Sequence, residues 1–184
     1  MFLAKKRPTV TTMLKSDTPE AALAEIEQIR SIGTDTFGMQ IDYLKPEYRT
    51  LPVVKRILDA MDGTPCYVTN YRGGDPNADD EMLAETLLAA ADYGKVLLDL
   101  RCDMFDPREG EYTEDQTAVS KQKAFIRAAH AKGAEVLMST HIFGRFVPKE
   151  EVKRIARAAA ERGADISKIV TTANSEDELQ QNLE

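Results

Sequence analysis

Short apolar runs rich in β-branched residues alternate along the chain with stretches in which apolar residues recur at helical spacing. The first helical stretch begins with Thr18 as its N-cap and Pro19 at its first helical position, and it ends at Gly33. Strands are predicted at residues 8–13, 34–41, 66–71, 95–101, 134–141 and 168–172, and helices at residues 18–33, 50–63, 79–93, 113–132 and 148–162, with a sixth helix after Asn174.

Helical spacing also predicts which side chains face the core, because residues three and four apart share one side of a helix. The predicted inward side chains are Leu23, Ile26 and Ile29 in the first helix, Val54, Ile57, Leu58 and Met61 in the second, and Met82, Leu83, Leu87 and Leu88 in the third.

A glycine marks three of the joints between a helix and the next strand, at Gly33, Gly133 and Gly163. Glycine at this position adopts the positive φ that ends a helix, so the joints repeat one βα unit. Strands separated by helices run parallel. Six such units fit either an open doubly wound sheet or most of an eight-stranded barrel. The pair Gly73 and Gly74 lacks the third glycine of a dinucleotide-binding loop, which argues against that kind of site.

Length and charge narrow the class of protein. With 184 residues the chain is long enough for one core, and we expect a single domain over residues 1–184. A net charge of −7 argues against binding to nucleic acid or to an anionic membrane. No apolar run approaches the roughly 18 residues of a membrane span, and the N-terminus lacks a signal-peptide pattern, so we expect a cytoplasmic protein. The two cysteines, Cys66 and Cys102, are predicted core thiols.

Lys168 stands out because it lies in an apolar strand run. Strand alternation puts Lys168, Val170 and Thr172 on one face. An amine surrounded by apolar side chains is desolvated, which disfavours its ammonium form and leaves a nucleophile that can condense with a ketone. The alternative is that Lys168 is only the exposed first residue of a strand.

His141 closes the preceding strand, at the carboxyl end where parallel barrels carry their active sites. An imidazole there can take a proton from carbon and return it to a leaving group, because histidine exchanges protons near neutral pH. The alternative is a structural histidine. The other histidine, His130, falls near a helix C-terminus and is interpreted as structural. Because His141 and Lys168 lie on consecutive strands, their side chains are expected to converge.

Two stretches then resemble a known family. Residues 139–143 (Ser-Thr-His-Ile-Phe), followed by a helix and by residues 163–169 (Gly-Ala-Asp-Ile-Ser-Lys-Ile), look like the matching region of type I 3-dehydroquinate dehydratases. In that family a histidine ending one strand and a lysine on the next form the catalytic pair. Residues 18–25 resemble the family's first helix, and Asp42 occupies the aspartate of its second-strand motif.

The resemblance implies a TIM-type (β/α) barrel that dehydrates 3-dehydroquinate to 3-dehydroshikimate in the shikimate pathway, without a metal or organic cofactor. It implies that Lys168 forms an imine with the substrate ketone and that His141 moves the protons. The expected partner is a polyhydroxylated cyclic keto acid. Arg72 matches the arginine that ends the family's third strand and is expected to contact this substrate.

The sequence also departs from the family's pattern. Gly38 and Gln40 stand where the family's second strand carries a glutamate and an arginine, and Arg101 stands where its fourth strand carries an acid. We therefore expect Gln40 and Arg101 at the substrate, with the cation moved from position 40 to position 101. Asp75 is a candidate to replace the glutamate that follows the third-strand arginine in the family. Arg145 is a candidate to bind the carboxylate of the substrate.

The resemblance covers nearly the whole chain and extends through six βα units, whereas the family has two more. Three explanations are open: a truncated barrel, a wall completed by a second chain as in a homodimer, or a sheet that has become open. Two other functions are also open. One is a divergent, non-catalytic barrel protein of the same family, and the other is a class I aldolase-type enzyme that forms an imine at the same lysine.

Overall fold

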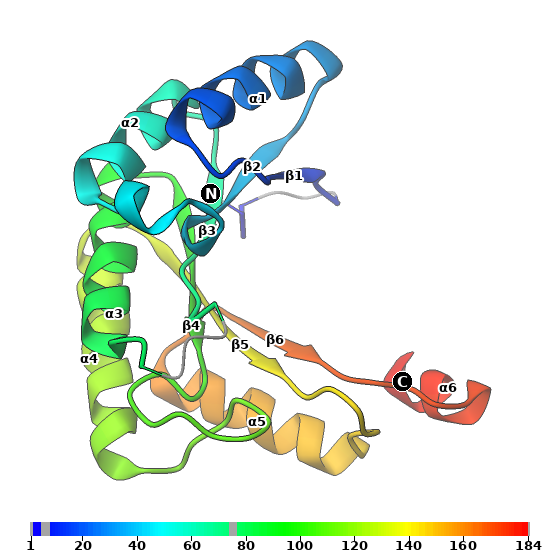
Figure 1. Ribbon diagram of the computed structural model, residues 1–184. Helices are drawn as coiled ribbons and strands as arrows, with labels where there is room; N and C mark the ends of the chain where they lie inside the picture. Colours follow the sequence, from blue (N-terminus) through cyan, green and yellow to red (C-terminus); the bar gives the residue numbers. More distant parts are fainter. Residues whose placement is uncertain (1, 5–7, 74–76, 184) are drawn as a thin grey trace. The chain divides into compact units, whose positions relative to one another are not determined.

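The computed structural model describes residues 2–4, 8–73 and 77–183 (Figure 1). In these residues parallel strands alternate with helices. The elements are β1 (Thr11–Leu14), α1 (Pro19–Ile32), β2 (Thr36–Gln40), η1 (Ile41–Tyr43), η2 (Pro46–Tyr48), α2 (Leu51–Ala60), β3 (Cys66–Thr69), α3 (Asp80–Ala89), η3 (Ala90–Tyr93), β4 (Val96–Arg101), α4 (Gln116–Ala131), β5 (Glu135–His141), α5 (Lys149–Arg162), β6 (Ile166–Val170) and α6 (Glu176–Leu183).

The strands lie in the sheet in the order of the sequence, from β1 to β6. A doubly wound sheet reverses its strand order at a switch point, whereas a (β/α) barrel adds each strand beside the previous one. The sequential order therefore settles the choice that the sequence pattern left open, and the fold is of the TIM-barrel type. The chain divides into two compact units, described separately below: Met1–Asp99 with Ala128–Glu135, the N-terminal unit, and Leu100–Arg127 with Val136–Glu184, the C-terminal unit.

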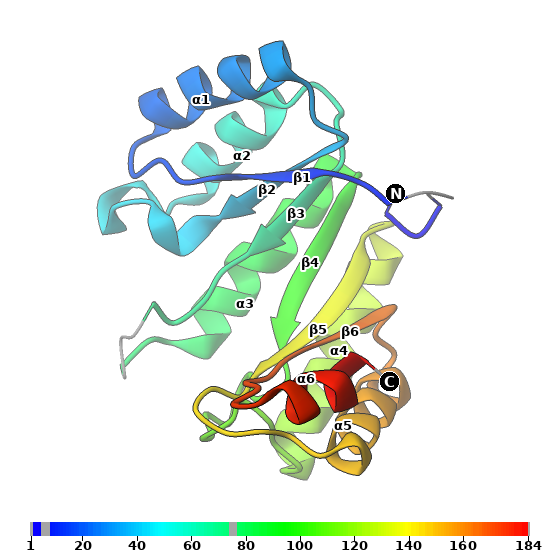
Figure 2. The ribbon, with the colours of Figure 1, turned by 90° about the vertical axis from the view of Figure 1, so that its right-hand side faces the viewer.

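In the N-terminal unit, β1, β2, β3 and the beginning of β4 pair in parallel, and α1 and α2 lie side by side (Figure 2). Thr18 caps α1, its hydroxyl accepting a hydrogen bond from the backbone N–H of Ala21, and Gly33 ends the helix with φ 89°. Met13 of β1 packs closely against Gly38 of β2, because a Cβ at position 38 would stand 1.9 Å from the Met13 sulfur. A side chain at this position would require the flexible Met13 side chain to move away from β2.

In the C-terminal unit, β5 and β6 pair in parallel (Figure 2). The register places Ser139 opposite Lys168 and His141 opposite Val170. α5 packs against β6. The loop that follows β5 joins α5 in an apolar cluster of Ile142, Val147 and Ile155, against which the partly buried Tyr112, Val152 and Ile169 pack.

The predicted strands and helices are confirmed, with shifts of a few residues at their ends, and two details are corrected. β6 begins at Ile166, so Lys168 is the third of its five residues rather than the first. Met82 is 59% exposed rather than inward. The buried face of α3 runs through Ala84 and Leu87, and Met82 lies about 140° around the helix from Leu87.

Both cysteines are buried, as predicted, and neither forms a disulfide. Burial raises the pKa of the Cys66 thiol, because the thiolate would be desolvated. Within the described residues, the structure has no helix that is both long and apolar enough to cross a membrane.

Candidate active site

Lys168 lies in the middle of β6 and is partly buried. Paired residues of parallel strands point to the same side of the sheet, so the register places Lys168 and Ser139 on one face. His141 follows Ser139 by two residues and therefore belongs to the same face. The alternative of an exposed strand-opening lysine is wrong, since β6 has two residues before Lys168 and burial covers part of its side chain.

His141 ends β5, and its side chain is 15% exposed. Its Nδ1 lies 2.6 Å from Oε2 of Glu111. The ring stacks on that of Phe143, with 6.0 Å between ring centroids. The imidazole is thus held on one edge by a carboxylate and on one face by an aromatic ring.

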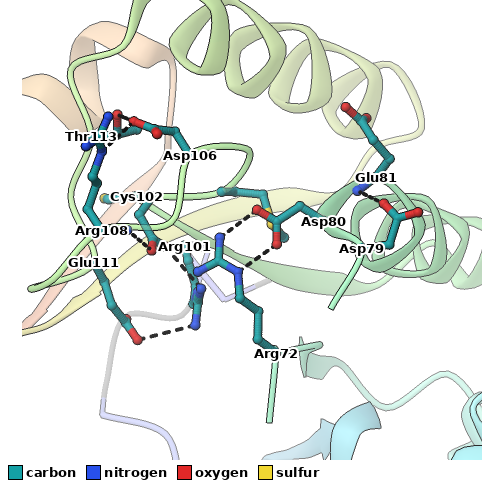
Figure 3. Close-up of polar contacts among 12 residues, drawn as sticks. Arg72, Asp79, Asp80, Glu81, Arg101, Cys102, Asp106, Arg108, Glu111 and Thr113 are labelled. Atoms are coloured by element: carbon teal, nitrogen blue, oxygen red, sulfur yellow. Dashed lines mark hydrogen bonds and ion pairs between the residues drawn. The ribbon is translucent and has the colours of Figure 1, made fainter. Parts of the chain in front are cut away.

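Arg101, the last residue of β4, is buried and lies beside the same carboxylate. Its Nη1 is 3.3 Å from Oε1 of Glu111 (Figure 3). Its Nη2 is 3.2 Å from Oδ1 of Asp103. The two oxygens of Glu111 are therefore divided between Arg101 and His141. The predicted cation at position 101 is linked to the histidine through one shared acid.

A buried polar network holds the loop between β4 and α4 that carries Glu111. The guanidinium of Arg162 donates to the backbone carbonyls of Cys102 at 3.1 Å and Thr113 at 2.6 Å, and to the amide oxygen of Gln122 at 2.8 Å. The amide nitrogen of Gln122 donates in turn to the carbonyls of Cys102 and Met104. Buried carbonyls keep their hydrogen bonds in this way, so the loop has a defined path.

A hollow of about 510 Å³ opens between the loop after β4 and the loop after β5. Arg145 lines this hollow and also pairs with Glu151. Its Nη1 donates to Oε2 of Glu151 at 3.1 Å, and its Nη2 donates to Oε1 at 2.7 Å. The Arg145 cation holds the pKa of Glu151 below its usual range. The residues lining the hollow are Glu109, Gly110, Ile142, Phe143, Gly144 and Arg145.

The other predicted site residues belong to the N-terminal unit. Arg72 forms a two-pronged pair with Asp80, through Nε at 2.7 Å and Nη2 at 2.6 Å (Figure 3). Gln40 donates from Nε2 to Asp42 at 3.0 Å. Asp75 lies outside the described residues. The roles of Arg72 and Gln40 in substrate binding stay predictions.

Two features of the structure were not predicted from the sequence. One is Glu111, which lies in a polar loop that carries no periodic signal. The other is a cluster in the N-terminal unit, where the hydroxyls of Tyr67 and Tyr71 both contact the carboxylate of Asp99. Burial and the Asp99 charge raise the pKa of the Tyr67 hydroxyl. Alternating positions of β3 and β4 could have signalled this pairing, because Tyr67 and Asp99 face the same side of the sheet.

The described residues contain no group of three or more histidine, cysteine or acidic side chains placed to hold a metal ion. An imidazole, a carboxylate and a guanidinium are instead in contact where β4 and β5 end, and the amine of Lys168 lies on the same face of the neighbouring strand β6. The fold and this arrangement together define a TIM-type (β/α) protein with a lysine and a histidine on neighbouring strands.

Comparison with known proteins identifies the family to which the chain belongs. Residues 10–181 match the family model of type I 3-dehydroquinase. The chain therefore belongs to the type I 3-dehydroquinase family.

Individual relatives agree with this assignment. A 3-dehydroquinate dehydratase of Listeria monocytogenes is 28% identical over 176 residues, which are 91% of this chain and 64% of that protein. The chain thus spans less than two thirds of that relative's length. The fold resembles the type I 3-dehydroquinate dehydratase of Clostridium difficile, with TM-score 0.78, 19% identity and coverage of 96% of this chain and 68% of the other. The enzyme of Geobacillus kaustophilus gives TM-score 0.77, 17% identity and coverage of 95% and 66%.

Proposed function

We propose that the chain acts as a carbon–oxygen lyase that dehydrates 3-dehydroquinate to 3-dehydroshikimate through an imine on Lys168. The observation that carries the proposal is the placement of Lys168 and His141 on one face of paired strands, with His141 held by Glu111. Membership of the type I 3-dehydroquinase family supports the choice of reaction.

The chemistry needs only an amine and a proton carrier. The Lys168 amine adds to the substrate ketone, and the carbinolamine loses water to give a cationic imine. This cation draws electrons from the adjacent C–H bond, so His141 can take that proton. The electron pair of the C–H bond forms the new double bond while the β-hydroxyl leaves with a proton from His141. Hydrolysis of the imine returns the amine, and the net change is the loss of one water.

The proposed substrate is a polyhydroxylated cyclic keto acid, which is recognised by cations and hydrogen-bond donors. In the C-terminal unit, Arg145 lines the hollow and Arg101 lies beside Glu111, so both are proposed to bind it. Gln40, Arg72 and Asp75 are proposed as further binding residues on the family resemblance. The Clostridium difficile enzyme was crystallised with covalently modified comenic acid, which agrees with covalent catalysis in the family.

Action without a metal or organic cofactor is part of the proposal, as is a homodimer. Pairing with a second copy would cover an edge strand, because an exposed strand edge offers unpaired N–H and C=O groups. Analytical ultracentrifugation of the purified chain, compared with its calculated mass of 20.5 kDa, measures this directly.

A second function on the same scaffold is favoured by one observation. Position 38 holds a glycine against which Met13 packs, and position 40 holds an uncharged glutamine, so two charged groups expected at the substrate are absent from β2. A non-catalytic protein, or an aldolase-type enzyme acting on another carbonyl compound, would keep Lys168 while changing what is recognised.

Borohydride reduction separates these functions. The chain is incubated with 3-dehydroquinate and sodium borohydride, and the modified peptide is located by mass spectrometry. A reduced adduct on Lys168, absent from Lys168→Ala and retained in the surface variant Lys153→Ala, supports the dehydratase. A folded chain that forms no adduct favours the non-catalytic function, and an adduct only with other aldehydes or ketones favours an aldolase.

A further inference from the structure

Glu111 has the geometry of a group that orients a catalytic base. Its Oε2 is 2.6 Å from Nδ1 of His141, and its Oε1 is 3.3 Å from Nη1 of Arg101. The side chain is 24% exposed, so water competes with these contacts only in part. A carboxylate held at both oxygens cannot turn away from the imidazole without losing a charged partner.

The backbone supports the same interpretation. Glu111 has φ 51°, in the left-handed region that non-glycine residues seldom adopt. Its N–H donates to the carbonyl of Arg108, and Thr113 two residues later is anchored by Arg162. A residue kept in this conformation by a buried network indicates a position that the fold specifies.

We propose that Glu111 is a positioning residue that fixes the tautomer of His141, and that the Arg162–Gln122 network places it there. This inference rests on the proposed function for its catalytic meaning. The carboxylate accepts a hydrogen bond from Nδ1–H, so the neutral ring carries its proton on Nδ1. The lone pair on Nε2 is then available to take the substrate proton. When Nε2 has accepted that proton, the negative charge of Glu111 stabilises the imidazolium.

The tautomer can be measured without substrate. The chain has two histidines, His130 and His141, so ¹⁵N-histidine labelling gives two assignable rings, and the ¹⁵N shifts report which nitrogen is protonated. In its neutral state, the His141 ring is expected as the Nδ1–H form, and Glu111→Ala is expected to convert most of it to the Nε2–H form. Glu111→Asp should keep the original form in part.

Glu114→Ala is the matched control, because Glu114 lies three residues along the same segment and pairs with Arg154 instead. It should leave the His141 signal unchanged, as should His130 in every variant. Circular dichroism and urea unfolding establish that the variants are folded. An Nε2–H ring in the unsubstituted chain, or an unchanged ring in folded Glu111→Ala, overturns the proposal.

Steady-state kinetics then tests whether the contact between Glu111 and His141 matters for turnover. In Glu111→Gln we expect kcat to fall about 10²-fold, because a base in the wrong tautomer loses much of the benefit of general acid–base catalysis. KM should change little, and borohydride should still trap Lys168. An unchanged kcat contradicts the positioning role. If the unsubstituted chain forms no adduct at all, the proposed dehydratase function is wrong. The NMR experiment uses no substrate, so it still tests whether Glu111 fixes the tautomer of His141.

Discussion

Two arginine–acid pairs, one in each unit, use the same chemistry for different ends. Arg72 and Asp80 in the N-terminal unit form a two-pronged pair whose side chains are only 12% and 10% exposed. In the C-terminal unit, Glu111 gives one oxygen to Arg101 and the other to His141. The first pair satisfies both carboxylate oxygens with a single cation. The second connects its charge to an imidazole, so residue types alone do not indicate which of the two pairs is proposed to serve catalysis.

The largest expected effect concerns the C-terminal unit. Lys168→Ala should lower kcat by about 10⁴-fold or more, since no other group can replace the amine in imine formation. The free energy of unfolding should stay close to its original value, because β6 keeps its backbone pairing. Steady-state turnover and urea unfolding measure the two quantities. Residual turnover within tenfold of the original would place the reaction elsewhere.

The next effect is on stability. Arg162→Met should lower the free energy of unfolding by about 3 kcal/mol, because the carbonyls of Cys102 and Thr113 would be buried without their donor. Urea unfolding followed by circular dichroism gives the value. Arg157→Met, on an exposed part of the same helix, is the control and should cost far less. Equal losses in the two variants would show that the network does not hold the loop.

Arg72 is expected to show a smaller effect of a different kind. If it contacts substrate as well as Asp80, Arg72→Gln should raise KM about tenfold, which corresponds to one charged hydrogen bond of about 1.4 kcal/mol. Asp80→Asn, which keeps the cation, should change KM less. Unchanged KM in a folded Arg72→Gln variant would make the N-terminal pair purely structural and would sharpen the contrast with Glu111.

The smallest effect depends on pH. Arg145 holds the pKa of Glu151 below its unfolded value, so the pair stabilises the fold above that unfolded value, near 4.5, and the contribution is lost as the pH falls through the folded pKa. Glu151→Gln should therefore lower the free energy of unfolding by less than about 1 kcal/mol at pH 7, and by progressively less as the pH falls through the folded pKa. Arg145→Gln should behave alike, and the double variant should lose no more. If the double variant lost the sum of the two single-variant losses in unfolding free energy, Arg145 and Glu151 would not act as a direct pair.

Local signals predicted most of the fold. The cap at Thr18, the glycine at Gly33 and the spacing of Ile26 and Ile29 act within a few residues, and the structure confirms that helix. Met82 was misplaced because several registers of an apolar-rich helix look alike in sequence. The buried face of α3 was decided by what packs against it.

The sequence by itself determined the alternation of strands and helices and the placement of His141 and Lys168 on consecutive strands. Both follow from local periodicity and from the rule that crossover connections give parallel strands. Only the tertiary structure decided that Glu111, thirty positions before His141, would hold its imidazole, and that Asp80 would take both prongs of Arg72. Such pairings depend on the path of a loop and on buried anchors such as Arg162, and no short-range pattern encodes them.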